Sequence, residues 1–147
     1  GGLVGPLRSV LDDLADRPVA VTIWSGEASA YDDTRLIRLV ADALAATEEA
    51  TRWLMANGAG DSTDSMAGAT PYLRMLGQLV GGWLLARLAL GAHRRLANGG
   101  DDEFLASKIV VARFYAEQLL PLARAQMGAV TAGASDLFAL PANRFSA

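Results

Sequence analysis

The run Val80–Arg95, VGGWLLARLALGAHRR, constrains the fold more than any other stretch of this 147-residue chain. Its apolar character, together with a proline at position 71 that suits the first turn of a helix, predicts a helix over 71–97. Gly81 and Gly82 lie side by side within it, although each interior glycine costs a helix about 1 kcal/mol relative to alanine. We therefore expect a compensating interaction at this point.

The predicted helix has no continuous polar face. Arg74 and Gln78 fall on nearly the opposite side of it from Arg87 and Arg94, so most of its circumference is expected to contact protein. A membrane span is not expected, because an arginine such as Arg87 in the middle of a bilayer costs about 2.5–3.5 kcal/mol on insertion scales.

Small residues gather on one broad side of the same helix. Such a pattern allows another helix to approach closely, and a tight helix crossing is the compensation that we expect for the glycines. The candidate helix-packing residues are Gly77, Gly81, Gly82, Ala86 and Ala89.

Two further long helices are predicted. Residues of the capping type and the pair Asn57-Gly58 bound a helix over 33–57, and an acidic run begins another over 101–131. Pro121 is expected to remove a backbone hydrogen bond from this last helix or to kink it. The remaining segments are a short helix and irregular connector over 1–32, a loop of small residues over 58–70, and a tail over 132–147. The apolar tail residues Leu137, Phe138 and Leu140 are expected to fold back on the bundle.

Composition favours one all-α domain over 1–147, an up-and-down bundle of about four helices. Apolar residues make up 52% of the chain and charged residues 20%. The absence of cysteine excludes disulfides and thiol chemistry and is compatible with a cytoplasmic protein. A net charge of −3 gives no positive field of the kind that binds nucleic acid. The start lacks both Met and a signal-like segment, so the chain is expected to be part of a longer protein.

No catalytic or metal site is predicted from the residues themselves. His93 is the single histidine, and it lies in the last turns of its helix, where the helix dipole favours it. No serine or aspartate is placed to complete a triad, and a di-iron site of the bundle type would need two histidines. The run GGDDEF, residues 99–104, is interpreted as a turn followed by a charged helix start.

The second half of the chain carries a more specific pattern. The segments TPYLRMLGQLVGGWLLARLA, FLASKIVVARFYAEQLLPLA and AGASDLFAL follow one another between Thr70 and Leu140. In this order they resemble the helical C-terminal extension of a branch of the bacterial acyl-CoA dehydrogenases. The first 57 residues fit this family more loosely, and residues 19–31 do not match it.

The resemblance implies a parent flavoenzyme that oxidises an acyl-CoA thioester to its 2,3-enoyl form in fatty acid metabolism. FAD would accept the hydride and a glutamate would remove the α-proton, and both would lie upstream of this extension. We therefore expect no catalytic residue and no cofactor in the chain itself. The expected partners are the rest of the parent dehydrogenase and a second subunit of a homo-oligomer. The candidate interface residues are Arg74, Arg113, Tyr115 and Glu117.

Two functions of different classes stay open at this point. The first is a non-catalytic packing and assembly domain of an FAD-dependent acyl-CoA dehydrogenase, which predicts an exposed apolar or arginine-bearing face. The second is a free-standing helical interaction or dimerisation module without enzymatic activity.

Overall fold

The computed structural model describes residues 33–58, 63–99 and 103–144, and the short helix and connector expected over 1–32 lie outside them. The long helices are α2 (Asp33–Asn57), α4 (Ala69–Ala97) and α5 (Glu103–Phe114). Short helical segments make up the rest: α3 (Thr63–Ala67), the π-helical turn η1 (Tyr115–Leu119), α6 (Pro121–Ala125), α7 (Met127–Thr131), and the 3₁₀ turns η2 (Asp136–Phe138) and η3 (Ala142–Arg144). The described part contains no strand, which confirms the expected all-α class.

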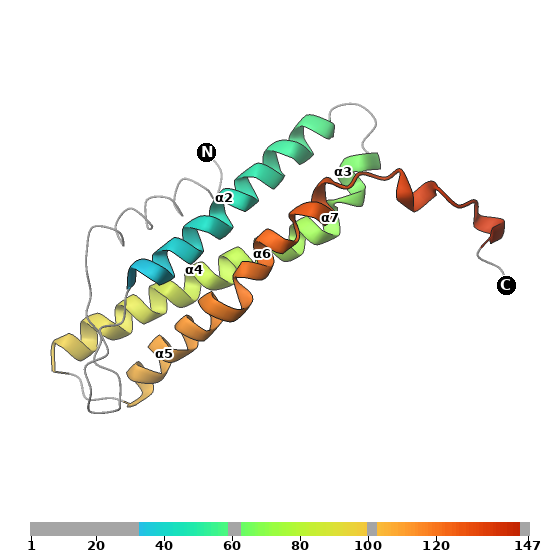
Figure 1. The fold of residues 1–147 in the computed structure, drawn as a ribbon. Helices are drawn as coiled ribbons and strands as arrows, with labels where there is room; N and C mark the ends of the chain where they lie inside the picture. Colours follow the sequence, from blue (N-terminus) through green and yellow to red (C-terminus); the bar gives the residue numbers. More distant parts are fainter. Residues whose placement is uncertain (1–32, 59–62, 100–102, 145–147) are drawn as a thin grey trace.

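The helices form an up-and-down bundle (Figure 1). α2 runs in one direction, α4 returns beside it, and the rod made of α5, η1, α6 and α7 runs back along α4. In this rod, α5 packs mainly against α4, whereas α6 and α7 contact both α2 and α4. The up-and-down topology expected from the sequence is therefore present.

Small side chains dominate the buried core, and this lets the helix axes approach closely. The largest fully buried side chains are Met75, Leu79, Leu120, Val40 and Val130, and most of the other core residues are alanines. A polar contact also joins two helices, since the Thr51 hydroxyl on α2 and the Tyr72 hydroxyl on α4 lie 2.8 Å apart.

The boundaries expected for α2 and the C-terminal end of α4 coincide with the observed ones, but the loop expected over 58–70 is wrong in part. This segment contains α3, and α4 begins at Ala69, two residues before Pro71. Pro71 still lies in the first turn of α4, where a backbone N–H has no partner inside the helix, so its ring causes no break.

The helix expected over 101–131 is interrupted as the position of Pro121 predicts. Proline cannot donate to the carbonyl four residues earlier. The chain forms a π-helical turn just before it, in which the Leu120 N–H donates to the Tyr115 carbonyl oxygen at 2.9 Å, and Pro121 begins α6. The rod therefore continues past the proline with a local change of helical register.

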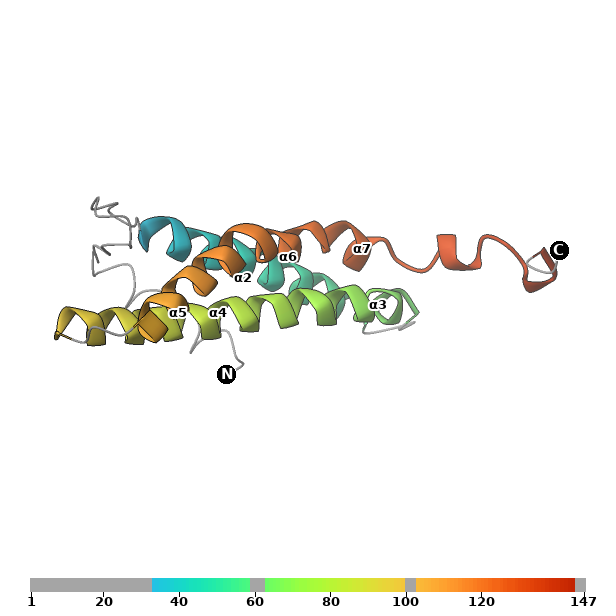
Figure 2. The same ribbon diagram turned by 90° about the horizontal axis from the view of Figure 1, so that it is seen from below.

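The tail does not fold back on the bundle, and that expectation is wrong. Figures 1 and 2 show the residues after α7 running away from the helices. Leu137, Phe138 and Leu140 are exposed by 63%, 72% and 58%. The physical reason lies at the base of the tail, where Gly133 has a φ of +73° and the Ala134 N–H donates to Asp64 Oδ1 at 2.8 Å.

Candidate packing site at the helix crossing

The close approach of two helices that the sequence predicts occurs where η1 and Leu120 cross α4. A methyl group added to Gly82 would lie 2.8 Å from Leu120 Cδ1, and one added to Gly81 would lie 2.5 Å from the Tyr115 hydroxyl. Real Cβ contacts are longer than this, so neither position accepts a side chain without movement of its neighbour. The glycine pair creates the space that Tyr115 and Leu120 occupy.

The π-helical turn explains why Tyr115 and Leu120 both reach α4. In an α-helix, residues five apart point about 140° away from each other. In η1 the hydrogen bond from Leu120 to Tyr115 closes one turn over five residues, so the two side chains come to one side of the rod. Pro121 and the pair Gly81-Gly82 are therefore parts of one arrangement, although they are far apart in the sequence.

Tyr115 also makes a polar contact across the crossing. Its hydroxyl donates to the Gln78 carbonyl oxygen at 3.2 Å, and burial raises the pKa of this tyrosine because it disfavours the charged form. The hydroxyl is held neutral, as a hydrogen-bond donor, at ordinary pH.

Two buried polar atoms of α4 have no hydrogen-bond partner within the described part of the chain. They are Gln78 Oε1 and Trp83 Nε1. These residues are five positions apart and therefore point to different sides of the helix. The Arg87 guanidinium lies 5.0 Å from the centre of the Trp83 ring, a distance that allows a cation–π interaction.

The other packing candidates divide into two groups. Ala86 and Ala89 are buried, as expected of residues at a helix interface. Gly77 is exposed, and a methyl group there would meet no described atom within 4 Å. The expectation of close packing at Gly77 is therefore wrong: its position on the helix turns it away from the rod, despite the four-residue spacing from Gly81.

One glycine that is packed more closely than Gly81 and Gly82 was not predicted from the sequence. Gly68, between α3 and α4, is buried, and a methyl group there would overlap the backbone carbonyl oxygen of Val130 on α7. A backbone neighbour cannot rotate away as a side chain can. The segment rich in glycine and serine that contains Gly68 reads as an ordinary loop, so nothing in the sequence distinguishes this glycine from its neighbours.

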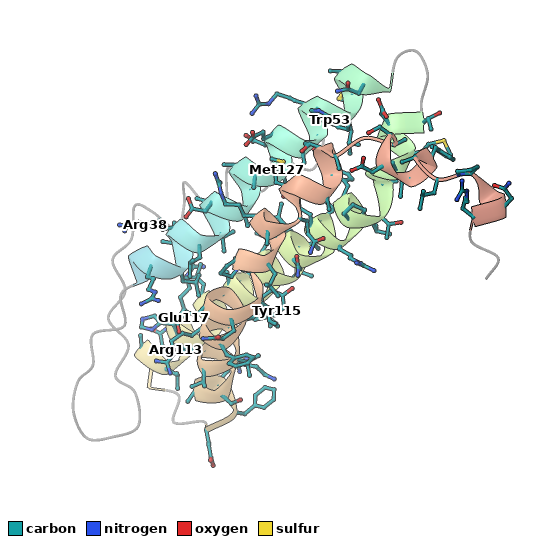
Figure 3. All side chains as sticks on the ribbon, turned by 45° about the vertical axis from the view of Figure 1, so that its right-hand side comes forward. Arg38, Trp53, Arg113, Tyr115, Glu117 and Met127 are labelled. Atoms are coloured by element: carbon teal, nitrogen blue, oxygen red, sulfur yellow. The ribbon has the colours of Figure 1, made fainter. Side chains whose placement is uncertain are left out.

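The candidate interface residues do not come together in one place. Figure 3 shows Arg113 and Glu117 on one side of the rod and Tyr115 on the other, toward α4. Glu117 Oε1 lies 3.6 Å from Arg35 Nε on α2, an ion pair at a solvent-accessible position. Arg74 is exposed on α4. A solvent-accessible ion pair such as Arg35–Glu117 contributes between 0 and about 1 kcal/mol, so it adds little to the free energy of unfolding.

The remaining chemical features of the described residues are few. Burial lowers the pKa of His93, because it disfavours the charged imidazolium. No group of three or more histidine, cysteine, aspartate or glutamate residues that could hold a metal ion occurs within 33–58, 63–99 and 103–144. α4 is long and apolar enough to cross a membrane by length and composition, a test that core helices of soluble proteins also pass.

This fold and this crossing define an all-α bundle of antiparallel helices that pack closely through glycine and alanine. The family described as "Acetyl-CoA dehydrogenase C-terminal like" matches residues 9–141, and the chain belongs to this family. The resemblance found in the sequence is thereby confirmed, and the match extends it to most of the first 57 residues.

A curated relative agrees with this assignment. The chain is 37% identical over 97 residues to a 3-methylmercaptopropionyl-CoA dehydrogenase of Ruegeria pomeroyi (strain ATCC 700808 / DSM 15171 / DSS-3). The matched segment covers 66% of this chain and 16% of the relative. Most of the relative therefore has no counterpart in these 147 residues.

Proposed function

We propose that residues 1–147 form a non-catalytic packing and assembly domain of an FAD-dependent acyl-CoA dehydrogenase. The family match over 9–141 and the dehydrogenase named among its relatives support this role. The parent reaction would be the α,β-dehydrogenation of an acyl-CoA thioester in the cytoplasm, as part of fatty acid metabolism. The partners would be the remainder of the dehydrogenase and a second subunit.

The observation that carries the packing role is the apolar surface of the hairpin made by α4 and α5. Leu84 and Leu88 lie one turn apart on α4 and are exposed, and four large side chains of α5 are exposed as well: Phe104, Val110, Val111 and Phe114. Monomeric soluble proteins rarely leave so many large apolar residues in water on neighbouring helices, and such surfaces mark protein interfaces. The hairpin is therefore the face that would rest on the parent enzyme.

The described residues do not fit a flavin site. The two buried polar atoms without partners, Gln78 Oε1 and Trp83 Nε1, point to different sides of α4 and cannot face one ligand. FAD would therefore be held by parts of the enzyme outside this chain, where it would accept the hydride from the acyl-CoA. The chain's own contribution would be structural, through the crossing and the exposed hairpin.

A membrane span is not part of this proposal, although α4 has the length and composition for one. One face of α4 is already used in packing, since the buried residues recur every three or four positions: Met75, Leu79, Gly82, Ala86, Ala89 and Ala92. A helix that packs against α2 and the rod serves as the central element of a bundle.

The test begins with the gene. The complete reading frame that encodes residues 1–147 is expected to contain an acyl-CoA dehydrogenase region, and its product is expected to bind FAD and to bleach on addition of acyl-CoA substrate. A complete frame without a dehydrogenase region, or a purified product without flavin, would defeat the proposal and favour a free-standing helical interaction module.

A further inference from the structure

The C-terminal arm, residues 132–144, projects from the end of the bundle (Figure 2). The Leu137 N–H donates to the Ala134 carbonyl oxygen at 3.0 Å in η2, and the Arg144 N–H donates to the Pro141 carbonyl oxygen at 2.9 Å in η3. These hydrogen bonds are local to the arm. Beyond its buried base at Ala134, residues 135–141 are exposed.

The direction of the arm is fixed where it leaves α7. Gly133 has the left-handed φ of +73°, and a methyl group there would lie 3.1 Å from Asp64 Oδ1. The same carboxylate oxygen accepts the Ala134 N–H at 2.8 Å, and Ala134 is buried. Asp64 on α3 therefore anchors the base of the arm, and the residues that follow point away from the helices (Figure 1).

Large apolar side chains are exposed both on the arm and at the end of the bundle from which it starts. Leu137, Phe138 and Leu140 are each more than half exposed within four residues of chain. α2 ends, and α3 and α4 begin, at the same end of the bundle, and these elements expose Met55, Met66 and Leu73. Apolar residues held in water on an anchored segment mark a surface that another polypeptide covers.

We infer that the C-terminal arm docks, through Leu137, Phe138 and Leu140, on the part of the same acyl-CoA dehydrogenase that lies outside residues 1–147. This inference rests on the proposed function. The family match runs through residue 141 and so includes all three apolar residues, which makes the arm part of the family's domain. The matched segment is only 16% of the dehydrogenase relative, so a large polypeptide surface is there to receive it.

The test uses the full-length protein with a photo-reactive residue in the arm. Phe138→p-benzoylphenylalanine is expected to cross-link on illumination to a peptide outside residues 1–147, identified by mass spectrometry. The matched control carries the same residue in place of Arg52, which is exposed on α2, and is expected not to yield that product. A cross-link from position 138 only to residues 1–147, of the same or a second copy, or no cross-link at all, overturns the inference.

Hydrogen exchange provides a second measurement that does not depend on cross-linking chemistry. In the full-length protein, amides of residues 136–140 are expected to exchange at least tenfold more slowly than in the double variant Phe138→Asp, Leu140→Asp. The core of α4 around Leu79 should exchange equally in both, which shows that the bundle remains folded. Equal exchange of the arm in both proteins overturns the inference.

The two proposals fail differently. A complete reading frame that contains no dehydrogenase region defeats the proposed function and, with it, the docking inference. A flavin-containing, active enzyme in which the arm exchanges freely and Phe138 cross-links only within residues 1–147 overturns the docking of the arm alone.

Discussion

Replacing single glycines of α4 by alanine separates the effect of packing from that of helix propensity. Gly82→Ala adds a methyl group 2.8 Å from Leu120 Cδ1, and Leu120 is fully buried, so its side chain has little room to move. Gly77→Ala adds the same group where no described atom lies within 4 Å. Both changes remove one glycine from the interior of the same helix, so Gly77→Ala is the matched control.

The expected free energies follow from two terms. Either alanine gains about 1 kcal/mol of helix propensity over glycine. At Gly82 an overpacking cost of about 1–3 kcal/mol opposes this gain. Gly77→Ala is therefore expected to stabilise the protein by up to about 1 kcal/mol, and Gly82→Ala to leave it unchanged or destabilise it by up to about 2 kcal/mol. The propensity terms cancel in the difference between the two variants, which is about 1–3 kcal/mol.

Urea unfolding followed by far-ultraviolet circular dichroism measures this difference. With a typical dependence of about 2 kcal/mol per molar urea, the midpoints of the two variants should differ by about 0.5–1.5 M. Two variants of equal stability, within about 0.5 kcal/mol, would refute the close crossing of α4 by Leu120. A Gly82→Ala variant that is more stable than the Gly77→Ala variant would also refute this close crossing.

Four further outcomes are expected from the environments of Gly68, Tyr115 and His93. Gly68→Ala is expected to destabilise the protein by about 1–3 kcal/mol in the same urea assay, since the new methyl group meets the backbone carbonyl of Val130; an unchanged midpoint would contradict this. Tyr115→Phe should lose about 0.5–1.5 kcal/mol with the hydrogen bond to the Gln78 carbonyl. Because burial raises the pKa of Tyr115, the wild type should also lose stability above pH 10, where the unfolded chain ionises, and the Tyr115→Phe variant should lack this loss in a pH series of melting temperatures. Burial lowers the pKa of His93, so the stability that depends on its neutral form is complete above pH 6.5 and is lost as the pH falls below it. Between pH 7.5 and 5.5, the melting temperature of the wild type should therefore fall relative to that of His93→Gln. A constant difference in melting temperature between the two proteins would exclude this effect.

The sequence was sufficient for the features that depend on local signals. Capping residues and hydrophobic spacing predicted α2 with its observed ends, and the adjacent glycines predicted a close crossing of α4 at Gly81 and Gly82. Pro121 predicted a disturbance in the last helix, and the structure shows it as a π-helical turn. In each case the relevant information lies within a few residues of the feature.

Other features depend on contacts between distant parts of the chain and could not be predicted. The buried role of Gly68 arises from Val130, more than sixty residues later. Gly77 has the spacing of a packing residue, but only the position of the rod decides which side of α4 is covered. The apolar tail was expected to fold back because burial is favourable, yet the anchor between Asp64 and Ala134 directs it outward.

The π-helical turn also lies where the contacts of the rod change, between α5 before it and α6 and α7 after it. Ahead of it, α5 faces mainly one neighbour, α4; beyond it, α6 and α7 face two, with Ala123 and Val130 buried. Because η1 holds one residue more per turn than an α-helix, deleting a single residue there would let the turn close as an ordinary α-helical turn, in which residues four apart share a face. Val130 would then stay on the side that faces the core, so this turn holds one additional residue without changing which side of α6 and α7 is buried.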